Sequence, residues 1–263
     1  VADDTAGVGT ARRDVGAASY GGDKALFGYG IVSSVSSLKN LVSNSGVVAA
    51  DVAGVGTARR DVAAVGYGDD LAMFAYGNTG SKTNLKNLVT NQGVVGANVT
   101  GVGTARGDLA ASRYGVGLGI FGYGNTGSKV SITNLVTNVG VIGTDVSGVG
   151  TARQSLAACT FGGDKAIFGF GKDGSNETSI TNLVSNVGVV AANTTGVGAA
   201  REKLGACSFG GDKGIFAFGV DNGGAGRVST SNLVSNSGVV ASNTTGVGSA
   251  TNRLGAAGFS FSA

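Results

Sequence analysis

A Gly-Val-Gly tripeptide recurs along the chain at an almost constant spacing. Its six copies begin at Gly7, Gly54, Gly101, Gly148, Gly196 and Gly246, so the spacings are 47, 47, 47, 48 and 50 residues. A fixed period of this length is typical of folds built from repeated supersecondary units. We therefore predict one domain over 1–263, with repeats at 7–53, 54–100, 101–147, 148–195 and 196–245 and with 1–6 and 246–263 as closing segments.

Each repeat contains the signals of four short strands. In the first repeat these are 14–20, 24–29, 38–43 and 47–52, separated by the turn signals Gly-Gly-Asp and Asn-Ser-Gly and by one longer connection. Phe27 and Tyr29 are two residues apart, which predicts that they share one face of their strand. Four antiparallel strands of this length are the content of one blade of a β-propeller.

The chain is therefore predicted to be all-β, a five-bladed β-propeller of four-stranded antiparallel blades. Its 50 glycines disfavour helices, and no repeat has a 3.6-residue apolar stripe. Small residues at the start of each repeat, such as Ala17 and Ala18, would let the inner strands approach one another around the axis. Two alternatives stay open, namely part of a six- or seven-bladed propeller and a β-solenoid. We expect the two ends of the chain to meet in one closing blade.

The sequence lacks the residues that several classes of function require. The net charge is only +3 without a basic run, which disfavours nucleic acid, and no stretch of 18 apolar residues suggests membrane insertion. Histidine is absent and only two cysteines occur, so histidine-based triads are impossible and neither a metal site nor a cofactor is expected. Cys159 and Cys207 are expected to be small apolar residues of the interior. Acidic residues such as Asp23 recur at turns, which leaves a carboxylate-based glycosidase as a minor alternative to a non-enzyme.

One face of the disc is the candidate partner-binding face. An arginine precedes the first strand of every repeat, and the connections between the second and third strands enter the same face and vary most between repeats. The arginines could form a cationic ring near the mouth of the channel, or each could bond a neighbouring blade. The candidate residues on this face are Arg12, Arg59, Arg106, Arg153, Arg201, Asn78, Lys82, Asn125, Lys129, Lys172, Asp173, Asp221, Asn222 and Arg227.

The segment from Arg153 to Gly171 reads Arg-Gln-Ser-Leu-Ala-Ala-Cys-Thr-Phe-Gly-Gly-Asp-Lys-Ala-Ile-Phe-Gly-Phe-Gly. It resembles the kelch motif over the first two strands of each repeat, and it departs from that motif where Asn182-Leu-Val-Ser-Asn186 stands instead of the later Tyr and Trp. Near-identical kelch-like units of this kind are also similar to those of bacteriophage tail and virion-associated propellers. This second resemblance implies a structural or host-recognition role, in a virion or extracellular setting.

We expect a non-enzymatic binding or structural protein whose partners are other structural proteins or a host-surface glycan or protein. A soluble glycan-binding lectin is the alternative, although no aromatic residue for sugar stacking occurs in the variable connections.

Overall fold

The computed structural model describes residues 4–221 and 226–259, and this part of the chain contains strands and no helix. The strands are β1 (Gly16–Tyr20), β2 (Lys24–Gly28), β3 (Lys39–Val42), β4 (Ala63–Tyr67), β5 (Leu71–Ala75), β6 (Lys86–Val89), β7 (Ala110–Tyr114), β8 (Leu118–Gly122), β9 (Thr133–Val136), β10 (Ala157–Phe161), β11 (Lys165–Gly169), β12 (Lys172–Asp173), β13 (Asn176–Glu177), β14 (Thr181–Val184), β15 (Arg201–Glu202), β16 (Gly205–Phe209), β17 (Lys213–Ala217), β18 (Val220–Asp221) and β19 (Ser231–Val234). The all-β prediction is confirmed.

Five antiparallel sheets of three strands account for most of these elements. Their strand orders are β1-β2-β3, β4-β5-β6, β7-β8-β9, β10-β11-β14 and β16-β17-β19. Each lies within one of the five predicted repeats, and the second strand is always the central one. The turn at 21–23 forms where it was predicted, between Tyr20 and Lys24, which pair with each other. Gly21 and Gly22 take positive φ angles of 62° and 78° there, a conformation that glycine adopts without a steric penalty.

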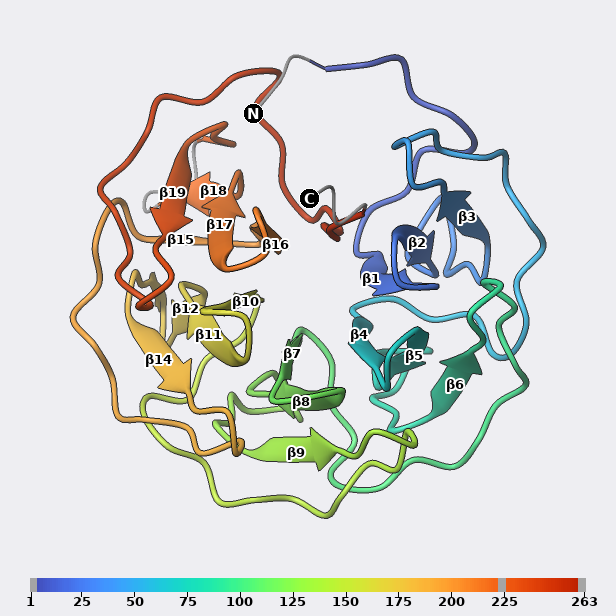
Figure 1. Cartoon of the computed structure of the whole chain (residues 1–263), viewed down its shortest axis with the longest axis horizontal. Helices are drawn as coiled ribbons and strands as arrows, with labels where there is room; N and C mark the ends of the chain where they lie inside the picture. Colours follow the sequence, from blue (N-terminus) through green and yellow to red (C-terminus); the bar gives the residue numbers. More distant parts are fainter. Residues whose placement is uncertain (1–3, 222–225, 260–263) are drawn as a thin grey trace.

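The five sheets stand around a common centre (Figure 1). The first strand of each sheet is innermost, and β3, β6, β9, β14 and β19 lie toward the outside. Neighbouring inner strands contact each other in the order β1, β4, β7, β10, β16. These strands have sequences such as Gly-Ala-Ala-Ser-Tyr and Ala-Ala-Cys-Thr-Phe, whose small side chains permit the close approach.

The apolar core lies between neighbouring sheets. Phe74 of β5 lies over Gly16 and Gly28 of the preceding sheet and meets Tyr29 edge-on, with ring centroids 5.0 Å apart. The equivalent pairs Tyr76–Phe121, Tyr123–Phe168 and Phe170–Phe216 repeat this contact at 5.1–5.3 Å. Such edge-to-face pairs stabilise beyond the area they bury.

The expectation that Phe27 and Tyr29 share a face is wrong. Tyr29 has a φ of 64°, and its equivalents Tyr76, Tyr123, Phe170 and Phe218 have 63–66°. This left-handed conformation interrupts the alternation of the strand, so the Phe of each unit faces the preceding unit and the aromatic residue two positions later faces the following one.

The predicted four-stranded sheets also need correction. The fourth segment of each unit forms isolated bridges with the third strand, such as Lys39 with Val52 and Val42 with Val48, and no continuous ladder. Beyond these bridges the segment runs around the outside of the molecule (Figure 1).

The two ends of the chain meet at a sixth position. Residues 254–258 lie between β16 and β1, where Gly205 lies against Leu254 and Ala256, and the Ser19 hydroxyl donates to the carbonyl of Gly258 at 2.7 Å. On the outside, the amide of Ser249 donates to Asp4 at 2.9 Å. The expected count of five positions is therefore corrected to six, of which five hold a three-stranded sheet.

Candidate functional site

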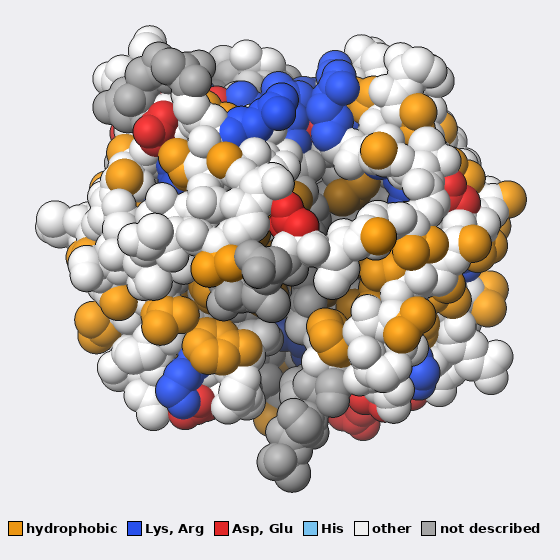
Figure 2. All heavy atoms as spheres, turned by 90° about the horizontal axis from the view of Figure 1, so that it is seen from above, with side chains coloured by type: hydrophobic (Ala, Val, Ile, Leu, Met, Phe, Trp, Pro, Cys, Tyr) orange, Lys and Arg blue, Asp and Glu red, His pale blue; other side chains and the backbone are white. Residues whose placement is uncertain are grey.

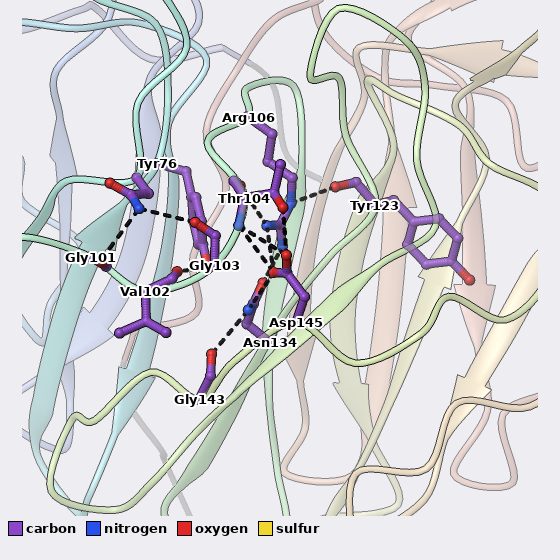
Figure 3. Close-up of polar contacts among 11 residues, drawn as sticks. Tyr76, Gly101, Val102, Gly103, Thr104, Arg106, Tyr123, Asn134, Gly143 and Asp145 are labelled. Atoms are coloured by element: carbon purple, nitrogen blue, oxygen red, sulfur yellow. Dashed lines mark hydrogen bonds and ion pairs between the residues drawn. The ribbon is translucent and has the colours of Figure 1, made fainter.

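The repeated arginines are buried and bind the scaffold itself. Figure 3 shows Arg106, whose Nε donates to the carbonyl of Tyr123 at 2.9 Å and whose Nη2 donates to Asn134 at 2.7 Å. Its guanidinium also stacks on the ring of Tyr76 in the preceding unit, 4.3 Å from the centroid. Asp145 completes the cluster by accepting from Asn134 and from the amide of Thr104.

The stacking and the Nε bond to a backbone carbonyl recur at Arg59, Arg153 and Arg201. The Nη2 bond to asparagine does not: Nη2 of Arg201 donates to the carbonyl of Phe216, and Nη2 of Arg59 and of Arg153 has no partner among the described residues. All four guanidinium groups are buried, and each lies 4.2–4.3 Å from the centroid of an aromatic ring in the preceding unit. Burial lowers the pKa of each of them. The idea of an open cationic ring is therefore corrected, because these four side chains are out of reach of a partner. Arg12 differs: its side chain is 4% exposed and bonds Asp51 and Asn40, but no aromatic ring of the described residues stacks on it.

The candidate residues in the variable connections are mostly half-buried and contact neighbouring units. Lys82 pairs with Asp108 at 3.5 Å, while Lys129 donates to the carbonyl of Gly174 and Asn125 donates to Gln154. These contacts tie the connections of the second and third units to the unit that follows each of them.

The remaining candidates are bonded locally or exposed. The side-chain oxygen of Asn78 accepts a hydrogen bond from the backbone amide of Gly80. Lys172 forms an ion pair with Glu177 at 3.3 Å, and Asp173 is the strand-pairing partner of Asn176 in the β12–β13 hairpin. Asp221 ends β18 opposite Arg201, and Arg227 is exposed. Asn222 lies outside the described residues.

The structure instead brings together six equivalent residues around the axis, which we call the axial mouth. Each backbone N–H donates to the carbonyl of its predecessor at 2.8–3.3 Å, and the series closes on itself because Asp14 donates to Arg253. All six have φ angles of 54–58°. The mouth encloses a cavity of about 90 Å³. Its six residues are Asp14, Asp61, Asp108, Ser155, Lys203 and Arg253.

The charges of the axial mouth are unevenly distributed. Three consecutive positions are acidic, while Lys203 and Arg253 are basic, and Arg253 pairs with Asp14 at 3.0 Å. Burial, together with the negative charges of Asp108 and Asp14, raises the pKa of Asp61 to about 6, although Arg60 lies 3.5 Å away. The mouth can thus offer both carboxylate acceptors and cationic donors to a polar group. No cluster able to hold a metal ion occurs among residues 4–221 and 226–259.

Sequence reasoning missed the axial mouth although its signal was available. Each mouth residue follows the repeated arginine position by two residues, so the alignment of repeats contains it. The side chain varies from Asp to Ser, Lys and Arg, and what the six positions share is a backbone conformation.

A second repeated surface feature is a set of exposed valines on the outer segments, which we call the valine rim. Val47, Val94, Val141, Val189 and Val239 occupy one equivalent position and are 54–65% exposed. The valine of each Gly-Val-Gly, from Val8 to Val247, is 37–49% exposed. Hydrophobic side chains are visible along the side of the molecule in Figure 2. Contiguous exposed apolar patches are typical of sites of contact with other proteins.

Comparison with protein-family models and with curated proteins gives no match for this chain. In the described part of the chain no helix is long and apolar enough to span a membrane.

Proposed function

We propose that this protein is a non-enzymatic β-propeller of structural or binding function, a virion or phage-tail component that contacts other proteins or a host surface. The valine rim is the observation that carries the proposal. Apolar side chains at the same place in every unit would give a partner equivalent contacts around the circumference. Burying them would remove apolar area from water, which is the main driving force of stable protein association.

The buried arginine clusters suit such a role. Each joins two neighbouring units through stacking and hydrogen bonds. The units would therefore keep their arrangement when a partner binds the valine rim. The polar side chains of the repeat are thereby used by the scaffold, and the outer surface is left for contact.

Site-specific photo-crosslinking tests the proposal in material from the protein's natural source. We expect a crosslinker at Val141, on the rim, to capture a specific neighbouring polypeptide, and one at Ser128, in an exposed connection, to capture it poorly. Native mass should then far exceed 25.5 kDa. A free monomer that crosslinks at neither position would overturn the proposal.

The axial mouth favours a second candidate, a glycan-binding lectin. Asp61 and Lys203 could bond sugar hydroxyls at a shared polar cavity. Glycan screening of the wild type and of Asp61→Ala separates this candidate from the first, because binding that depends on Asp61 would favour the lectin.

A further inference from the structure

The sixth position lacks the two strands that complete the other five among the described residues. Residues 254–258 take the place of an inner strand, and two cavities flank them, an apolar one of about 190 Å³ and one of about 290 Å³ that is lined in part by polar side chains. Figure 2 views this edge and shows hydrophobic side chains on both sides of a hollow. The five complete positions show what covers the equivalent surfaces.

The first cavity has the lining of an aromatic site. In the first unit, Gly16, Gly28 and Tyr29 are covered by Phe74 of the next sheet. Their equivalents in the last unit, Gly205, Ala217 and Phe218, line the cavity of about 190 Å³. An apolar cavity of roughly 150 Å³ is enough to bind benzene. This cavity therefore suits a phenyl ring in the place that Phe74 takes elsewhere.

The second cavity has the lining of a tyrosine site. The ring of Tyr29 is held by Arg59 at 4.2 Å, and its hydroxyl donates to the carbonyl of Val55 at 3.1 Å. The residues equivalent to Arg59, Phe74 and Val55 are Arg12, Phe27 and Val8, and all three line the cavity of about 290 Å³.

The Arg12 side chain is already buried at the position where a tyrosine ring would stack. Its side chain is 4% exposed, and its Nε is buried without a hydrogen-bond partner in the part of the chain that the structure describes. The other four arginines each lie against a ring. A tyrosine entering the second cavity would supply the missing stacking surface.

Phe209 offers a third contact for an occupant of the sixth position. Its equivalents Tyr20, Tyr67, Tyr114 and Phe161 are 2–4% exposed, because each packs on the glycine of the turn that follows the third strand of the next unit. Phe209 is 41% exposed. A turn glycine from an occupant of the sixth position would cover it.

We propose that the sixth position binds a pair of antiparallel strands whose sequence follows the pattern of this chain's own second and third strands. Phe-Gly-Tyr on its first strand fills the two cavities, and a glycine turn after its second strand covers Phe209. The first strand pairs with the backbone of residues 255–258 by strand addition. The proposal shares Val8 with the valine rim but does not depend on the exposure of the other rim valines.

A synthetic peptide of residues 24–47 is the probe, because it contains Phe27, Tyr29 and the turn glycine Gly46. We expect it to bind the full chain with a stoichiometry of one, measured by calorimetry. Phe27→Ala in the peptide should weaken binding by about a hundredfold, since it removes the phenyl ring from an apolar cavity. The matched control, Ser33→Ala in the peptide, changes a residue that is exposed in its own unit and should leave affinity unchanged.

Cys207 supplies a readout at the site itself. Its thiol is free and half-buried and lines the first cavity, whereas its equivalent Cys159 is buried beneath the next sheet. We expect saturating peptide to abolish alkylation of Cys207. Ala217→Phe in the chain, which fills the first cavity from within, should abolish peptide binding, and circular dichroism checks that this variant is folded.

Three results would overturn the proposal: no binding, equal binding of the Phe27→Ala peptide, or undiminished alkylation of Cys207 at saturation. Self-association of the chain that the peptide does not disrupt would also count against it, because a second copy would then occupy the edge. None of these results depends on the crosslinking at Val141.

Discussion

The repeated arginine shows how one residue type at one position connects two units. Nε of Arg106 donates a hydrogen bond to the carbonyl of Tyr123 in its own unit, and its guanidinium stacks on the ring of Tyr76 in the preceding unit. A planar, delocalised cation can stack and donate several hydrogen bonds at once, whereas lysine is a point charge. The position therefore requires arginine for its geometry as well as for its charge.

Replacing Arg106 with Lys should lower the free energy of unfolding by about 2–4 kcal/mol, because Asn134 and the carbonyl of Tyr123 lose buried donors. Urea unfolding followed by circular dichroism measures the change. Arg13→Lys is the control, since the Arg13 side chain is 55% exposed, and it should have little effect. Equal stability of Arg106→Lys and the wild type would contradict this role.

Asp61 makes stability depend on pH. Its pKa is raised to about 6 in the folded protein from an ordinary 3.8, so the folded state binds the proton more tightly than the unfolded chain does. This contribution to stability is therefore present at low pH and is lost as the pH rises through about 6. Asp61→Asn should be more stable than the wild type by about 1–3 kcal/mol at about pH 8, with the difference vanishing below about pH 4. Urea unfolding across this range measures it, and a difference independent of pH would refute the assignment.

At the scale of the element, the central strand and the outer segment differ in how they are held. The central strand β8 pairs along its length with β7 and β9. The outer segment that follows β9 depends on isolated bridges and on Asn134, which donates to Gly143 and Asp145. Elements with few protected hydrogen bonds open at low free energy.

Asn134→Ala should therefore accelerate hydrogen exchange in the outer segment 141–147 and leave β8 slow. Exchange followed by mass spectrometry resolves the two regions. Asn138→Ala changes an exposed residue and is the control. Uniform acceleration across the third unit would show that the segment and the sheet open together.

Much of the element-scale structure could be predicted from the sequence, because the repeat fixed which segments are equivalent and the Gly-Gly-Asp turns fixed the hairpins. Two features could not. The reversed face of Tyr29 comes from a positive φ, which a two-residue spacing does not encode. The burial of Arg59 follows from contacts with a neighbouring unit, which become visible only when the units are placed around the centre.

At the scale of the whole molecule, the N-terminal and C-terminal segments together form an additional position around the axis. The repeats predicted five positions around the axis. The structure has six, because Asp14 and its five equivalents form a closed series of backbone hydrogen bonds. Asp4 takes at the sixth position the role that Asp51 has in the first unit, where it accepts from Thr10. Closure between the N-terminal and C-terminal segments is thus the central feature of the architecture, since it also creates the edge proposed to bind a strand pair.

A disulfide between Asp4→Cys and Ser249→Cys, in a chain with Cys159 and Cys207 replaced by Ala, tests closure most directly. The matched control is Thr57→Cys with Asn98→Cys, which has the same local geometry within the chain and does not span the closure. Both pairs should oxidise within the monomer, as non-reducing mass spectrometry would show. If the control pair forms and the Asp4–Ser249 pair stays reduced or links only separate molecules, the ring is open and the account is wrong.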